Sequence, residues 1–178
     1  MTVCTPLRVE RVALRALRPV HTGMGAARSA RARLSGPVLV AGVGGATTSA
    51  VRPGDVVVAT EVRGAGAPRP CESVEFLVDA LRELGLTVHS GPIVSSRRLV
   101  TGSARGRLGD ALAVDMESAW LATDGPFAVL RVIVDTPDHP LVRPGTLARG
   151  ITALRTLRRT APAIRRWVAR THPAQEVS

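Results

Sequence analysis

Three acidic residues lie at positions in the sequence where a side chain can meet a ligand. Glu10 follows a first apolar segment, Glu117 follows a short apolar run, and Asp135 closes a Val-rich run. A carboxyl group there can transfer a proton or accept hydrogen bonds from hydroxyl groups. Each acid also has a structural alternative, since Asp caps helices and turns, and Glu10 can pair with Arg8 or Arg11 at the surface. The convergence of three acids favours a site.

Short runs of apolar residues predict the strands that would position these acids. The runs 38–43, 55–62 and 127–134 are Val-rich and bounded by Gly, Pro or Asp, which is typical of strands buried on both faces. Residues 86–89 are a weaker candidate, and residues 2–5 and the stretch around Val20 predict edge or hairpin strands. The acids would then follow strand ends, where α/β folds bind ligands.

Helical periodicity alternates with these runs. Apolar residues recur at helical spacing from 74 to 84, after Ser73 as N-cap and before Gly85. A long apolar stripe from 147 to 168 predicts a C-terminal helix, which Pro162 should kink or divide. The alternation predicts an α/β layer fold, with residues 1–172 as a single domain and 173–178 as a flexible tail.

Two glycine-rich segments follow predicted strands. In HTGMG (21–25), the backbone N–H groups of Gly23 and Gly25 can face an anion or polar ligand at the start of a helix predicted over 26–34. In AGVGG (41–45), Val43 and Gly44 allow a flat ligand to approach the backbone closely. Neither segment matches a dinucleotide or P-loop motif, and both also suit simple strand-to-helix turns.

The strong positive charge has a compositional explanation. The formal net charge is +10, and all 24 residues counted as Lys or Arg are arginine, spread along the chain. Aromatic residues make up 2% of the sequence, too few for a platform on which bases could stack. We therefore expect no specific nucleic-acid partner.

Several other chemistries lack their signatures. The two cysteines and four histidines have no metal-ligand spacing, there is no GxSxG serine motif, and Cys71 suits a buried thiol better than a reactive one. No apolar run approaches the ~20 residues of a membrane span. We expect a cytoplasmic protein that uses no metal or organic cofactor.

The ordered motifs resemble the nucleoside phosphorylase and nucleosidase superfamily, which cleaves purine N-glycosidic bonds. The segments that carry this resemblance are TPLRVE (5–10), HTGMG (21–25), VLVAGVGG with RPGDVVVAT (38–60), SGPIVSS with LVTGS (90–103), AVDMESA (113–119) and FAVLRVIVDTPDHPL (127–141). The resemblance implies a three-layer αβα sandwich with a central mixed, largely buried sheet.

Within that superfamily, the chain is most similar to the hopanoid-associated branch, whose members remove adenine from adenosylhopane to leave ribosylhopane. This narrower resemblance rests on the connection from VVVATEVR to RPCES, the DTPDHPLVRPGT segment and the LRTLRRTAPA helix. A methylthioadenosine or S-adenosylhomocysteine nucleosidase is the near alternative. The resemblance implies a nucleoside substrate and a homodimer.

The resemblance also implies roles for individual residues. Asp135 falls on the general acid, and Glu10 on the glutamate that activates water. Glu117 falls on the ribose-binding glutamate, with Met116 packing against the sugar. Leu99 and Val100 fall on the purine-contacting pair, where Leu99 replaces an aromatic residue and should weaken base stacking.

Three features leave the reaction type open. Hydrolytic relatives place a serine before the acid, whereas this chain has Val134. Arg8, together with the HTGMG amides, suits phosphate as nucleophile, whereas the Glu10 carboxylate suits water and repels phosphate. Hydrolysis is therefore favoured over phosphorolysis. Because Val134 and shortened loops depart from the family pattern, a catalytically silent nucleoside-binding or scaffold domain remains a further alternative.

Overall fold

The computed structural model describes residues 2–64, 66–137 and 146–171. Along the chain these form β1 (Thr2–Thr5), α1 (Arg8–Ala13), η1 (Arg15–Leu17), β2 (Val20–His21), α2 (Ala26–Ser29), β3 (Val38–Ala46), β4 (Val56–Gly64), β5 (Gly66–Pro70), α3 (Val74–Arg82), β6 (Val88–Ser95), η2 (Gly102–Leu108), β7 (Ala113–Asp115), η3 (Ser118–Trp120), β8 (Phe127–Asp135), α4 (Thr146–Arg159) and α5 (Ala161–Thr171), where η marks a 3₁₀ helix. Part of the family-like segment 127–141 and the expected tail 173–178 lie outside the described residues.

The strands form one mixed sheet in which five strands pair in a closed circuit. β3 pairs with β8, β8 with β4, β4 with β6, β6 with β7, and β7 again with β3. β1 extends this sheet from β3, followed by β2, and β5 extends it from β4. The β3–β8 and β4–β6 pairs are parallel, whereas the β4–β8 and β3–β7 pairs are antiparallel. The predicted mixed sheet is thus confirmed.

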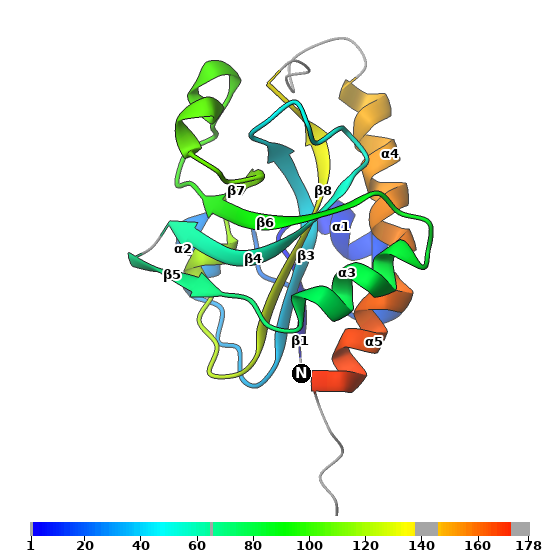
Figure 1. Ribbon diagram of the computed structural model, residues 1–178. Coiled ribbons are helices and arrows are strands. Elements are labelled where there is room, and N and C mark those ends of the chain that lie inside the picture. Colours follow the sequence, from blue (N-terminus) through cyan, green and yellow to red (C-terminus); the bar gives the residue numbers. More distant parts are fainter. Residues whose placement is uncertain (1, 65, 138–145, 172–178) are drawn as a thin grey trace, which may run out of the picture.

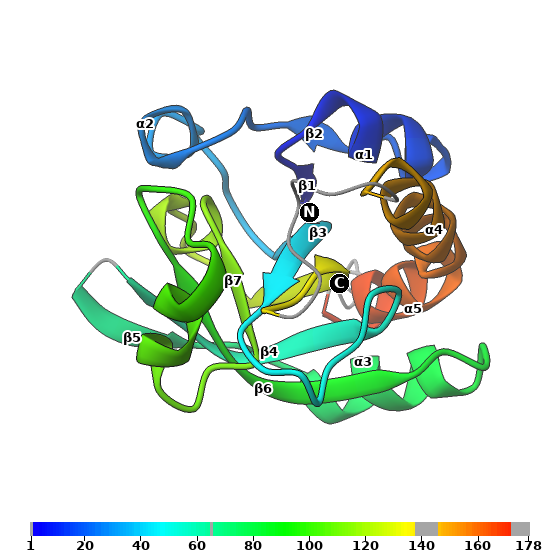
Figure 2. The same ribbon diagram turned by 90° about the horizontal axis from the view of Figure 1, so that it is seen from above.

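Helices cover one face of the sheet more thickly than the other. Helices α1, α3, α4 and α5 gather on one side (Figures 1 and 2), where Leu81, Leu157 and Trp167 pack against residues of β3, β4 and β8. The other face is covered by shorter segments, including the chain after α2, at Ala32 and Leu34. The predicted α/β layer fold is therefore confirmed, with a second helical layer made of short pieces.

The Val-rich strands serve both faces because their side chains alternate. On β8, Leu130 and Val132 join the core under the long helices, whereas Val129 and Ile133 join the core on the opposite face. Because alternate side chains point to opposite faces and both faces are buried, such a strand needs apolar residues at consecutive positions. This alternation also places Arg131 on the same face of β8 as Ile133. Between Ile133 and Asp135 the register with β3 is irregular, since Ile133 pairs with Gly44 and Asp135 with Gly45.

Local predictions had mixed outcomes. The predicted helices at 74–84 and at the C-terminus are present, and the latter is divided at Thr160, two residues before Pro162. The helix predicted over 26–34 is wrong in length, since α2 ends at Ser29. Ser73 adopts a left-handed conformation (φ 54°) and makes no side-chain capping bond. The edge or hairpin interpretation of 2–5 is also wrong, because β1 lies between β2 and β3 and is parallel to both.

Candidate active site

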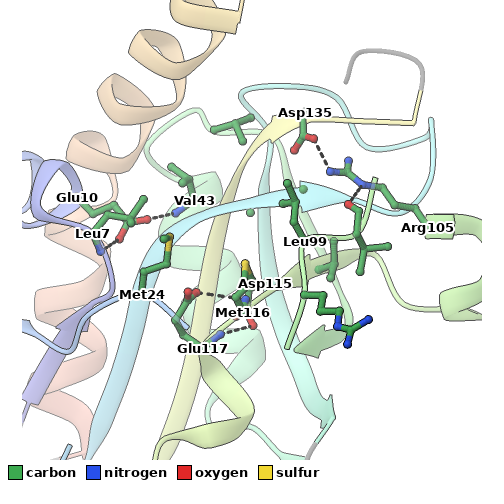
Figure 3. Close-up of a pocket in the computed structure, with 16 residues that line it drawn as sticks. Leu7, Glu10, Met24, Val43, Leu99, Arg105, Asp115, Met116, Glu117 and Asp135 are labelled. Atoms are coloured by element: carbon green, nitrogen blue, oxygen red, sulfur yellow. Dashed lines mark hydrogen bonds and ion pairs between the residues drawn. The ribbon is translucent and has the colours of Figure 1, made fainter. Parts of the chain in front are cut away.

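A pocket opens beyond the carboxyl ends of β3, β7 and β8. Its volume is about 240 Å³. The predicted acids Glu10, Glu117 and Asp135 all reach it, although they come from three separate segments (Figure 3). The residues that line it are Leu7, Glu10, Met24, Val43, Gly44, Gly45, Arg98, Leu99, Val100, Arg105, Val114, Asp115, Met116, Glu117, Val134 and Asp135.

Glu10 projects from α1 and is held by backbone groups. Its Oε1 accepts a hydrogen bond of 2.7 Å from the N–H of Val43 on β3, and its Oε2 accepts one of 2.7 Å from the N–H of Leu7. The side chain is buried, and this burial raises the pKa of Glu10 to about 7, against the lowering effects of Arg131 and the two N–H groups. Glu10 therefore changes its charge near neutral pH.

Arg131 lies at the centre of an acidic cluster and is completely buried. Its Nη2 lies 2.6 Å from Oδ2 of Asp115 and 3.7 Å from Oε2 of Glu117. Burial alone would lower the pKa of Arg131, but Asp115, Glu117 and Glu10 raise it above its ordinary value. The guanidinium is therefore a permanent cation facing three carboxyl groups, and the cluster carries a net negative charge when all three are ionised.

Asp115 and Glu117 have different environments although they are near neighbours. Asp115 accepts hydrogen bonds from Ser95, Ser118 and Arg131, and its pKa is held below its ordinary value although burial acts in the opposite direction. Burial raises the pKa of Glu117, against the effect of Arg131. Asp115 is thus a structural acid, whereas Glu117 faces the pocket and accepts a hydrogen bond of 2.9 Å from the N–H of Gly25.

Asp135 ends β8 and forms a buried ion pair. Its Oδ2 accepts a hydrogen bond from Nη2 of Arg105, and only 2% of either side chain is exposed. Its other carboxylate oxygen, Oδ1, is buried and has no hydrogen-bond partner among the described residues. Burial raises the pKa of Asp135, whereas Arg105 and the charge of Arg149 lower it, with a net upward shift.

The remaining wall of the pocket is apolar. Val43, Val100 and Val114 line it, and Leu99 and Met24 reach it with 60% and 55% of their surfaces exposed. An apolar wall with a few polar groups is typical of sites for flat organic ligands. Leu99, on the segment after β6, and Met24, after β2, thus give the pocket an apolar rim.

The structure brings together most, but not all, of the predicted site residues. Gly25 reaches the site through its bond to Glu117. Arg8 is exposed on α1 and lines a separate hollow with His21, Gly23 and Arg28. The structure therefore places neither Arg8 nor Gly23 among the residues that line the acidic pocket.

Sequence reasoning missed Arg131 and Arg105. Arg131 interrupts the run FAVLRVIV, and an ionisable residue inside a fully buried strand requires a partner. That signal was present and pointed to buried acids nearby. Arg105 lies in η2, between β6 and β7, among other arginines, and no sequence pattern separates it from Arg107.

No ligand set for a metal ion was found, since the described residues contain no suitable group of three His, Cys, Asp or Glu side chains. Burial raises the pKa of Cys71 to about 12, so this cysteine is held as a neutral thiol. A search of the same residues for a helix able to cross a membrane found none.

The fold defined by these elements is nucleoside phosphorylase-like, as superposition on solved structures shows. The 5'-methylthioadenosine/S-adenosylhomocysteine nucleosidase from Neisseria meningitidis in complex with methylthio-immucillin-A has a TM-score of 0.73 at 19% identity, over 91% of this chain and 96% of that chain. The Helicobacter pylori nucleosidase with butyl-thio-DADMe-Immucillin-A has a TM-score of 0.72 at 15% identity, over 95% and 97%.

A hydrolase with a different name has a similar fold. Futalosine hydrolase of Helicobacter pylori strain 26695 has a TM-score of 0.72 at 16% identity, over 95% of this chain and 97% of that chain. No protein-family model and no curated protein matches the sequence. The comparisons therefore show the fold, and the chemistry must be argued from the site.

Proposed function

We propose that this chain hydrolyses the N-glycosidic bond of a purine nucleoside and releases the base. The observation that carries the proposal is that Asp135 lines one apolar pocket together with Glu10 and Glu117, which come from other segments of the fold. Similar folds in proteins named nucleosidases and futalosine hydrolase support it. The proposal agrees with the roles implied by the sequence resemblance.

The chemistry requires opposite charges at the two ends of the breaking bond. Departure of the base leaves an oxocarbenium-like cation on the ribose and negative charge on the base, as in glycoside hydrolysis. Asp135, when protonated, can donate to N7 of the purine and improve the leaving group. Glu117 can accept hydrogen bonds from the ribose hydroxyl groups, and Met116 offers the sugar an apolar contact.

The acidic cluster supports water rather than phosphate as the nucleophile. Nη1 of Arg131 is buried without a hydrogen-bond partner among the described residues. A Cβ atom on Gly42 would lie 2.5 Å from this Nη1 and 2.6 Å from Oε1 of Glu10, so the absence of a side chain at Gly42 lets both groups pack closely against β3. Glu10 lines the pocket and could act as the base for a water molecule, whereas the carboxylates around it would repel a phosphate dianion.

The substrate class follows from the resemblance and the rim of the pocket. We propose an adenosyl nucleoside, with adenine as the released base, and adenosylhopane as the particular substrate. The exposed side chains of Met24 and Leu99 support a large apolar substituent on the sugar, because they would be covered by it. We also propose a homodimer, which sedimentation equilibrium of the wild-type chain would test.

A base-release assay tests the proposed reaction. Wild-type protein is incubated with adenosyl nucleosides, with and without phosphate, and the base and sugar products are identified by mass spectrometry. Hydrolysis predicts adenine and a free sugar in both conditions. Phosphate-dependent release with a ribose 1-phosphate would instead establish phosphorolysis.

Asp135→Asn tests the acid itself. Loss of a positioned acid predicts a fall in kcat of about 10²–10⁴-fold, with nucleoside binding retained in calorimetry. Asp79→Asn, on the exposed surface of α3, is the matched control and should leave kcat unchanged. Wild-type protein that binds nucleosides but releases no base would favour the silent binding domain.

A further inference from the structure

We propose that Arg105 is a positioning residue for Asp135, holding one oxygen of its carboxyl group so that the other faces the bound base. The proposal rests on the proposed base release for its kinetic consequences. It also has a consequence in the unliganded protein that needs no activity. It concerns a residue that no motif singled out.

Arg105 has three separate anchors. Its Nη2 donates to Oδ2 of Asp135, its Nε donates to the carbonyl oxygen of Val100 at 3.0 Å, and its Nη1 donates to the carbonyl oxygen of Ala46 at 3.1 Å. The side chain is 2% exposed, so water does not compete for these bonds. The guanidinium plane is therefore fixed by two backbone groups before it meets the carboxylate.

This arrangement leaves the two oxygens of Asp135 unequal. Oδ2 is occupied by Arg105, whereas Oδ1 is buried without a hydrogen-bond partner among the described residues. A Cβ atom on Gly45, which lines the pocket, would lie 2.8 Å from Oδ1. A buried polar atom without a partner is costly, and a ligand in the pocket would supply the missing partner. The pair thus presents one defined atom for proton transfer.

Arg105 also orients the carboxyl group of Asp135, which the residue before Asp135 in the sequence cannot do. Val134, which precedes Asp135, has no hydrogen-bonding side chain and so cannot orient the acid. Arg105 reaches the same carboxyl group from η2, a different part of the chain. Because it also binds the carbonyl of Val100, it links the acid to the segment of Leu99 and Val100 that lines the pocket.

Removing Arg105 should therefore have an orientational and an electrostatic effect. Among the described residues, the charged groups that act on Asp135 are Arg105 and Arg149 of α4, and both lower its pKa. Arg105→Met leaves burial opposed by Arg149 alone, so the pKa of Asp135 should rise. The protonated acid would then persist to higher pH while being poorly aimed.

The kinetic test compares Arg105→Met with Arg105→Lys and with Arg107→Met, an exposed control in the same η2 segment. Misplacement of a reacting group can cost about 10²-fold, and we expect a loss of that order in kcat for Arg105→Met, with KM little changed. The alkaline limb of its kcat profile should move to higher pH. Arg105→Lys should recover part of kcat and restore the limb, and Arg107→Met should match wild type.

A double variant separates positioning from a structural role. If Arg105 acts through Asp135, Arg105→Met should cause no further loss of kcat in the Asp135→Asn background. A further loss of the full size, or a fall in kcat without any movement of the alkaline limb, would overturn the proposal.

Carboxyl NMR titration of the unliganded proteins gives a readout that does not depend on catalysis. The pKa of Asp135 should be higher in Arg105→Met than in wild type and Arg107→Met. An unchanged pKa would overturn the positioning role even if base release occurs. Wild-type protein without base release but with the expected pKa difference would overturn the proposed function and leave the Arg105–Asp135 coupling established.

Discussion

At the residue scale, the site depends on how the buried guanidinium of Arg131 affects the pKa values of three carboxyl groups. Arg131 lowers the pKa of Asp115, Glu117 and Glu10 alike. Only Asp115 ends below its ordinary value, because the hydroxyl groups of Ser95 and Ser118 and the guanidinium of Arg131 also donate hydrogen bonds to it. The sequence indicated Glu10 and Glu117, but not Asp115, as site candidates. The differences between the pKa values of these three acids could not be predicted from the sequence, since they depend on burial and on partners distant along the chain.

Glu10 predicts a pH dependence for the reaction. A base that activates water must be ionised, and the pKa of Glu10 is raised to about 7 by burial. The value of kcat/KM should therefore rise as pH increases through about 7, and Glu10→Gln should be severely impaired without this acidic limb. The measurement is a pH profile of kcat/KM, with Glu75→Gln, exposed on α3, as control. A profile that is flat across neutral pH in the wild type would remove Glu10 as the base.

At the element scale, β3 makes room for the charged groups of its neighbours. Its glycines pair in register with the polar positions of β8, Gly42 beside Arg131 and Gly45 beside Asp135. A Cβ atom on Gly45 would lie 2.6 Å from Nη2 of Arg105. The sequence predicted that a ligand approaches the AGVGG segment, and Val43, Gly44 and Gly45 of this segment line the pocket. The stronger reason for the glycines of this segment, space for buried side chains of other strands, requires the strand register, which no local pattern reveals.

Gly42→Ala should disable the site without removing the strand. The added methyl group would meet Arg131 and Glu10 at 2.5 and 2.6 Å, so both side chains must shift. We expect a loss in kcat of about 10²-fold, the scale of a misplaced reacting group, with circular dichroism unchanged.

Gly150→Ala provides the contrast for this prediction. Gly150 lies within α4, and a Cβ atom there has nothing within 4 Å. Alanine should stabilise the helix by about 0.5–1 kcal/mol and leave activity as it is. Full activity of Gly42→Ala would show that the acidic cluster tolerates displacement.

At the scale of the whole molecule, the stability of the fold depends on the protonation of the buried carboxyl groups of the site. The folded pKa of Glu10 is about 7 and its ordinary value is 4.5. Between these values the folded protein holds a proton that the unfolded chain has released, so stability must fall as pH rises through this range. The raised pKa values of Glu117 and Asp135 act in the same direction.

Urea unfolding at several pH values measures this linkage. The free energy of unfolding of the wild type should decrease as pH rises from about 5 to 8, and the decrease should be smaller in Glu10→Gln, which has no proton to lose. Glu75→Gln should follow the wild type. A wild-type stability that increases over this range would contradict the burial of Glu10 as an acid.

The closed circuit of strands implies that the two halves of the pocket exchange amide hydrogens at different rates. β8 carries Arg131 and Asp135. It pairs with β3 along its length and also with β4 at residues 130–132, so the amide hydrogens of this central part should exchange only through global unfolding. The rim residues Met24 and Leu99 lie outside the strands and can open locally. Asp135 and Arg131 would thus stay in place while the rim at Met24 and Leu99 opens to admit a ligand. Substitutions that make this rim more mobile should change the rate of ligand entry without displacing Asp135 or Arg131.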